Sequence, residues 1–225
     1  RALARIDPRT NRIRAGEYMA AAGGSPLRLL ERLAAGEVIQ YELTLVEGWR
    51  FSQAMAAIRA HPKLRQTLPA DADGAAVMAA IGAEARHPEG RLLPETYRFP
   101  AGTTDVAFLR RAHEALQREV ASVWESRRDG LPYQSPEDML IMASIIERET
   151  GAPHERTKVA GVFVRRLGIG MRLQTDPTVM YGVAEDFTGR LRTIHLRTDT
   201  PYNTYTRAGL PPTPICLPGR ASLRA

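Results

Sequence analysis

Two glutamates near the middle of the chain, Glu147 and Glu149, have the residue type and the surroundings that acid–base chemistry needs. They end an apolar stretch, residues 139–146, and a Gly-Ala-Pro sequence follows at 151–153. At about 100° per residue on a helix, Glu149 falls inside the apolar face, whereas Glu147 lies near its polar margin. A carboxyl group in the last turn faces the negative end of the helix dipole, and apolar neighbours desolvate it. Both effects favour the protonated form, so Glu149 is the candidate general acid and Glu147 the fallback.

The alternative reading of these glutamates is structural. Acidic side chains at helix ends are commonly solvated or paired with a basic group, and spacing alone does not separate that role from catalysis.

A second polar region follows residue 173 and is rich in loops. Asp176 before Pro177 has the signature of a helix start, which makes a capping role more common than a ligand role. The run Tyr202-Asn203-Thr204-Tyr205 offers amide, hydroxyl and aromatic groups. Sugars need that combination, because their rings present polar edges and C–H patches. A turn anchored by two tyrosines explains the run equally well.

Composition predicts a globular protein and argues against nucleic acid as a partner. The 225 residues are 44% hydrophobic and 25% charged, which is enough for one large or two modest domains. The net charge is +6, but no block of five like charges occurs, and aromatic residues make up only 6%. The basic balance suits contact with anionic envelope polymers or membrane surfaces.

Metal chemistry and a membrane span are not expected from this sequence. A single cysteine, Cys216, excludes an intramolecular disulfide and a Cys-rich metal site, and the five histidines lack ligand spacing. We therefore expect no metal and no cofactor. There is no apolar run near the roughly 20 residues of a membrane helix, and no signal peptide begins at Arg1. The chain lacks an initial methionine and stops at Ala225, so we expect a soluble fragment of a longer protein.

The elements that must position the two glutamates are mostly helices. Ser135 before Pro136 predicts the start of the glutamate helix, and Gly151 predicts its end. The other predicted segments are helices that begin near Ser25, Phe51, Ala75, Asp105 and Pro153, a strand over residues 38–46 and an extended segment over residues 92–100.

Several short motifs occur together in a specific order and spacing, and the chain that carries them resembles a known family. They are Leu45-Val46-Glu47-Gly48, Leu93-Pro94-Glu95-Thr96-Tyr97, Gly130-Leu131-Pro132-Tyr133, residues 143–150, residues 170–178, Tyr202-Asn203-Thr204-Tyr205 and Gly209-Leu210-Pro211-Pro212. With these motifs the chain resembles the endolytic murein transglycosylases, also called YceG-like proteins, along nearly its whole length.

The resemblance implies an α+β architecture with two domains. A small LysM-like α/β module would occupy residues 1–102, and a mixed, helix-rich lytic transglycosylase domain of lysozyme-like type would occupy residues 103–225. Members of the family are held in the inner membrane by one N-terminal helix, with the catalytic domain in the periplasm. That helix is absent from this sequence. Family members also continue past the point that matches Ala225, so the catalytic domain is expected to be truncated.

The resemblance also implies a reaction. The family's catalytic glutamate precedes a small hydroxyl residue, which here is Glu149 before Thr150. The reaction cleaves the β-1,4 bond between N-acetylmuramic acid and N-acetylglucosamine without water. Glu149 would protonate the departing oxygen and then accept the muramyl 6-hydroxyl proton, which closes a 1,6-anhydro ring. One carboxylate suffices, because the nucleophile is intramolecular. The candidate sugar-binding residues are Gln174, Asp176, Tyr202, Asn203 and Tyr205.

Two rival functions remain open at this stage. A non-catalytic peptidoglycan-binding scaffold would use both glutamates structurally. A muramidase would let water attack, and Asp176 would be its second carboxylate. The expected partners are peptidoglycan glycan strands and peptidoglycan synthases, with no nucleic acid. The family's expected role is control of glycan chain length during wall assembly.

Overall fold

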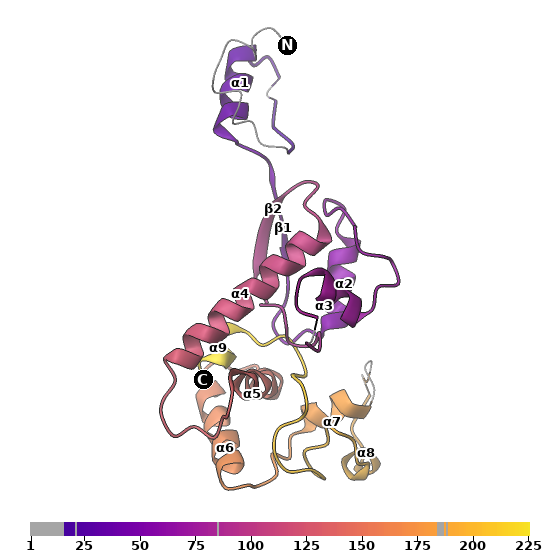
Figure 1. Ribbon diagram of the computed structural model, residues 1–225, viewed down its shortest axis with the longest axis vertical. Coiled ribbons are helices and arrows are strands. Elements are labelled where there is room, and N and C mark those ends of the chain that lie inside the picture. The colour runs from indigo at the N-terminus through magenta and orange to yellow at the C-terminus, as the bar shows by residue number, and fades with distance from the viewer. Residues whose placement is uncertain (1–15, 21, 85, 184–186, 188) are drawn as a thin grey trace.

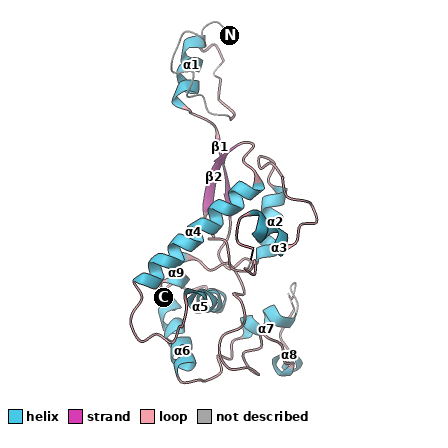
Figure 2. Ribbon diagram, in the orientation of Figure 1, coloured by secondary structure: helices cyan, strands magenta, loops and turns pink. Residues whose placement is uncertain are grey.

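The computed structural model describes residues 16–225 except 21, 85, 184–186 and 188, and within them it is a helix-rich α+β protein (Figures 1 and 2). The predicted α+β class is confirmed, while the LysM-like character of the N-terminal module and the truncation stay predictions. The elements are α1 (Pro26–Ala35), β1 (Gln40–Thr44), α2 (Phe51–Ala60), α3 (Gly74–Ala80), β2 (Thr96–Pro100), α4 (Asp105–Glu125), α5 (Pro136–Glu149), α6 (Arg156–Gly168), α7 (Asp176–Val183), α8 (Thr193–Arg197) and α9 (Arg220–Leu223).

Helix α1 forms as its sequence predicts but contributes nothing to the core. Ser25 accepts a hydrogen bond from the Arg28 amide, and Gly36 ends the helix with a φ of 70°. No residue of α1 is buried, and the helix stands apart at one end of the molecule (Figure 1).

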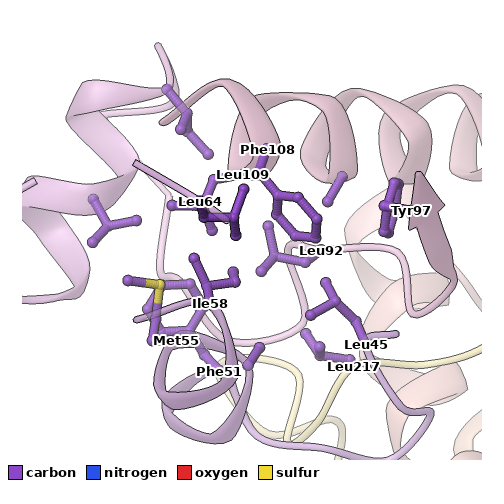
Figure 3. Packing of buried hydrophobic residues seen from close by; sticks show 14 of the residues in the cluster. Leu45, Phe51, Met55, Ile58, Leu64, Leu92, Tyr97, Phe108, Leu109 and Leu217 are labelled. Atoms are coloured by element: carbon purple, nitrogen blue, oxygen red, sulfur yellow. The ribbon is translucent and has the colours of Figure 1, made fainter. Parts of the chain in front are cut away.

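The two strands pair antiparallel and support the first hydrophobic core. Their register runs from Gln40 opposite Pro100 to Thr44 opposite Thr96. Tyr97 and Phe99 are buried, and both rings meet Phe108 of α4 edge to face, with ring centroids 5.3 and 5.6 Å apart. Figure 3 shows this core, in which side chains from α2, α4 and the segments between them interlock.

Helix α4 spans two cores. Phe108 and Leu109 in its first half pack with the strands and α2, whereas Leu116 and Val120 in its second half pack with α5 and α9. Residues on both sides of the predicted boundary at 102/103 therefore share the first core. The division into residues 1–102 and 103–225 stays a prediction.

Helix α5 lies at the centre of the second half of the molecule (Figure 1). It contacts α4, α6, α7 and α9. All eight residues from 139 to 146 are buried, so this stretch has no solvent-facing side. Ser144 in its middle accepts a hydrogen bond from the Ile215 amide at 3.0 Å, and the Cys216 thiol donates to the Ser144 carbonyl at 3.3 Å. The segment before α9 is thereby tied to α5.

The loop-rich region contains more helix than the sequence predicts. Asp176-Pro177 does begin a helix, α7, but α8 was not predicted, because five residues are too few to show helical periodicity. Within the part of the chain that the structure describes, no helix has both the length and the apolarity to cross a membrane.

Candidate active site

Glu149 is the last residue of α5, and its carboxylate lies at the surface. Its Oε2 atom accepts a hydrogen bond from the Thr175 hydroxyl at 2.6 Å. The residue is exposed, which corrects the expectation that it lies inside an apolar face. The reason is that α5 is buried on all sides up to Ile146, so helical spacing does not separate a core face from a solvent face. Only the final residues of the helix extend beyond the core, and Glu149, one of them, is therefore exposed.

Glu147 has the opposite environment. Its side chain is 7% exposed and lies 3.7 Å from the Arg156 guanidinium. Its Oε2 atom accepts hydrogen bonds from the Gly219 amide at 2.9 Å and from the Ser222 hydroxyl at 2.7 Å. These contacts join α5 to α6 and α9, which supports a structural role for the fallback residue.

Three buried threonines form the support beneath Glu149. The Thr175 amide donates to the Thr204 hydroxyl at 3.0 Å, and the Thr178 hydroxyl donates to the Thr175 carbonyl at 2.8 Å. The hydroxyls of Thr178 and Thr204 are also 2.8 Å apart. We call this group, Thr175, Thr178 and Thr204, the threonine cluster. It connects the loop before α7 to the loop after α8.

Asp176 and Tyr205 meet beside the threonine cluster. The Tyr205 hydroxyl donates to Asp176 Oδ1 at 2.6 Å. The pKa of Tyr205 is raised to about 12, first by burial and then by its hydrogen bond to Asp176 and the negative charges of Asp176 and Glu149, against the opposing charge of Arg166. Tyr205 therefore lies within electrostatic reach of two other predicted residues, Asp176 and Glu149. Gln174, next to Thr175, is exposed and adopts a left-handed backbone with a φ of 51°.

The other two predicted sugar-binding residues lie in the supporting framework. Asn203 is fully buried, and its amide nitrogen is 2.7 to 3.3 Å from three carbonyls at the end of α8, those of His195, Leu196 and Thr198. The Tyr202 hydroxyl is 2.8 Å from the Thr213 hydroxyl. The Tyr202 hydroxyl and the Asn203 amide are therefore bonded within the protein, where they stabilise the loops.

The threonine cluster was not among the predicted site residues. Threonine is common in loops, and its members are separated by up to 29 positions, so one sequence carries no signal that they meet. Only the fold brings residue 175 to the tip of α5.

Two hollows lie elsewhere in the described residues, and neither is lined by Glu149. One, of about 350 Å³, lies among β2, α4 and Arg220, and the other, of about 730 Å³, lies among α4, α5, α6 and the chain end. The described residues also contain no group of three or more His, Cys, Asp and Glu side chains that could hold a metal ion.

The fold and the site define a helix-rich α+β protein that presents one carboxylate at the end of a buried central helix. All of residues 1–225 match the model of the YceG-like family, and the chain belongs to that family.

Named relatives and a solved structure resemble the chain over most of its length. The chain is 31% identical over 229 residues to an endolytic murein transglycosylase of Bacillus subtilis (strain 168), covering 94% of this chain and 62% of the relative. It is 27% identical over 171 residues to one of Streptococcus pneumoniae serotype 2 (strain D39 / NCTC 7466), covering 72% of this chain and 28% of the relative. The chain thus spans less than two thirds of the length of these relatives. The crystal structure of a putative YceG-like protein from Listeria monocytogenes superposes with a TM-score of 0.63 at 27% identity, covering 99% of this chain and 78% of that one.

Proposed function

We propose that this protein is an endolytic peptidoglycan lytic transglycosylase. It cleaves the β-1,4 bond between N-acetylmuramic acid and N-acetylglucosamine and leaves 1,6-anhydro ends. The observation that carries the proposal is the state of Glu149. It is a surface carboxylate at the end of a fixed helix, with one oxygen bound to Thr175 and, among the described residues, no hydrogen bond to the other. The names of the relatives support the same activity.

Glu149 carries out both proton transfers in this proposal. Its protonated form donates to the departing glycosidic oxygen while positive charge develops on the muramyl ring. The carboxylate then takes the proton of the 6-hydroxyl, and that oxygen bonds to the anomeric carbon. No second carboxylate is required, because the nucleophile belongs to the same sugar.

The proposed sugar contacts differ in how available they are. Gln174 and Asp176 are exposed, and Tyr205 is half-buried, so these three side chains are the first candidates to touch the glycan. Tyr202 and Asn203 act indirectly, because their polar groups already bond to the protein.

A hydrolytic muramidase is the second candidate, and one observation favours it. Asp176 shares the neighbour Tyr205 with Glu149, so a second carboxylate lies near the proposed acid. If Asp176 activates water, the products have reducing ends instead of anhydro ends.

The wider setting follows from the family resemblance and is part of the proposal. The full-length protein is held at the inner membrane by an N-terminal helix and works in the periplasm. Its LysM-like region adds affinity for glycan, its cuts set glycan chain length, and peptidoglycan synthases are its partners.

The test is mass spectrometry of glycan strands treated with the full-length protein. Anhydro-ended products are expected from the wild type, and Glu149→Gln is expected to lower their rate at least about 100-fold, because general acid–base catalysis contributes that much. The matched control is Glu147→Gln, which removes the neighbouring carboxylate and retains cleavage if the protein folds. Reducing-end products identify a muramidase. A folded, glycan-binding wild type that cuts nothing identifies a scaffold.

A further inference from the structure

The bond between Thr175 and Glu149 has a role beyond packing. We infer that Thr175 is a positioning residue, whose hydroxyl holds Oε2 of Glu149 and leaves Oε1 as the oxygen that exchanges protons with the sugar. The inference rests on the proposed role of Glu149 and adds a residue to that site. Its first support is the contact itself, since 2.6 Å is the length of a hydroxyl bond to an ionised oxygen.

The hydroxyl of Thr175 is fixed by its surroundings. Thr175 is only 1% exposed, and its backbone amide and carbonyl are both bonded within the threonine cluster. The Thr175 carbonyl accepts from the Thr178 hydroxyl at 2.8 Å or from the Thr204 hydroxyl at 3.4 Å, and whichever of the two hydroxyls does not donate to it can donate to the other. The cluster therefore satisfies itself without the Thr175 hydroxyl, whose proton remains available for Glu149.

This arrangement makes the two carboxylate oxygens of Glu149 chemically different. Oε2 accepts a hydrogen bond in the charged and in the neutral form. Oε1 accepts none from the described residues, so it is the atom that carries the proton when the group is an acid. After that proton has been donated, Oε1 is deprotonated and can accept the proton of the 6-hydroxyl. Thr175 thus selects one rotamer and one reactive oxygen, and so provides the alignment that proton transfer requires.

Charged and titratable groups near Glu149 come from several elements. They are Arg148 on α5, Asp176 at the start of α7, Tyr205 in the loop after α8 and Arg166 on α6, which acts on Tyr205. None of them is altered by a substitution at residue 175. A change in pH dependence on such a substitution therefore reports the hydroxyl itself.

The experiment compares Thr175→Val, Thr175→Ser and the control Thr178→Val in the full-length protein. Valine keeps the shape and removes the hydroxyl, serine keeps the hydroxyl, and Thr178→Val removes a hydroxyl that lies in the same cluster but does not touch Glu149. For Thr175→Val we expect kcat to fall about 10- to 100-fold, the value of a hydrogen bond to a charged group, with KM within about twofold. The alkaline limb of the pH profile of kcat/KM moves to higher pH, because the ionised carboxylate has lost its donor.

Rescue separates positioning from a general loss of structure. Thr175→Ser is expected to restore kcat and the pH profile, and Thr178→Val is expected to lower stability without moving the alkaline limb. The inference is overturned if Thr175→Val keeps the wild-type kcat and pH profile, if folded Thr175→Ser is as impaired as Thr175→Val, or if Thr178→Val moves the profile equally. Should Thr175→Val not fold, Thr175→Ala gives the same comparison. Full activity in Glu149→Gln would instead remove the proposed function.

Discussion

At the scale of single residues, Glu89 is a buried carboxyl group that joins two parts of the molecule. Its Oε1 atom accepts a hydrogen bond from the Phe51 amide at the start of α2 at 2.9 Å, and Oε2 accepts one from the Tyr181 hydroxyl of α7 at 3.4 Å. Burial raises the pKa of Glu89 to about 7, against the opposing effect of the hydrogen bonds and of Arg50. The group therefore changes charge near neutral pH.

We predict that Glu89 makes the stability of the protein fall as pH rises from about 4.5 to about 7. In this window the folded chain keeps the proton that the unfolded chain releases, so the folded state loses stability until Glu89 ionises in both states. The loss is about 3 kcal/mol, at about 1.4 kcal/mol per pH unit. Glu89→Gln should remove this part of the slope, as measured by chemical denaturation across the window. The control is Glu84→Gln, at an exposed position. An unchanged slope in Glu89→Gln would contradict the assignment of this slope to Glu89.

The active-site residues show what a sequence can predict at this scale. Glu149 was selected over Glu147 by its predicted position on the helix and by the resemblance, in which the catalytic glutamate precedes a small hydroxyl residue. Its exposure and its bond to Thr175 were not predictable, because they depend on where α5 leaves the core and on a loop 26 positions later. Asn203 was predicted to touch sugar, and this stays a prediction; its bonds to the end of α8 could not be predicted, because a buried amide bonds to the polar groups that the fold places around it.

At the scale of elements, α5 is the part on which the site depends. Its start was predicted correctly, since Ser135 accepts a hydrogen bond from the Asp138 amide as an N-cap does. Its burial on every side was not predicted, because the residues that enclose it come from four other helices and from loops distant in the sequence. A helix enclosed in this way holds its terminal residue in a fixed position.

Ser144 is a sensitive position on α5. Its hydroxyl donates to the Ile141 carbonyl at 2.7 Å and accepts from the Ile215 amide at 3.0 Å, and the side chain is fully buried. We predict that Ser144→Ala lowers the free energy of unfolding by about 1–3 kcal/mol, because it leaves the Ile215 amide buried without an acceptor. Thermal and denaturant unfolding check this. Ser122→Ala, at an exposed site on α4, should have almost no effect, and an equally small effect at Ser144 would show that the bond is unimportant.

At the scale of the whole molecule, the first core and the second half meet at the turn before α2. The Gly48 amide donates to the Leu217 carbonyl at 2.9 Å, and the Arg148 guanidinium donates to the Gly48 carbonyl at 3.3 Å. Glu47 packs beside Gly219, and burial, followed by the charge of Glu147, raises the pKa of Glu47. The motif around Glu47 is therefore part of the contact between the two halves, which the sequence alone did not show.

A double-mutant cycle tests this contact. A Cβ atom at Gly219 would overlap the Glu47 carboxylate, so Gly219→Ala must displace that side chain. Because the overlapping atoms belong to a flexible, exposed side chain that can move aside, we predict a loss of no more than about 1 kcal/mol in the wild type and a smaller loss in a Glu47→Ala background, measured by denaturant unfolding. Equal losses in both backgrounds would mean that the two residues do not interact.

The threonine cluster also determines how early the site can assemble while the chain is being synthesised or exported. Glu149 precedes Thr175 by 26 positions and Thr204 by 55, as the printed sequence shows. A chain that is synthesised or exported from its N-terminus completes α5 well before the loop after α8 becomes available. Until that loop arrives, Thr175 lacks its support, and the carboxylate at the tip of α5 is free to rotate. The order of residues along the chain thus delays assembly of the site until nearly all of this segment has emerged.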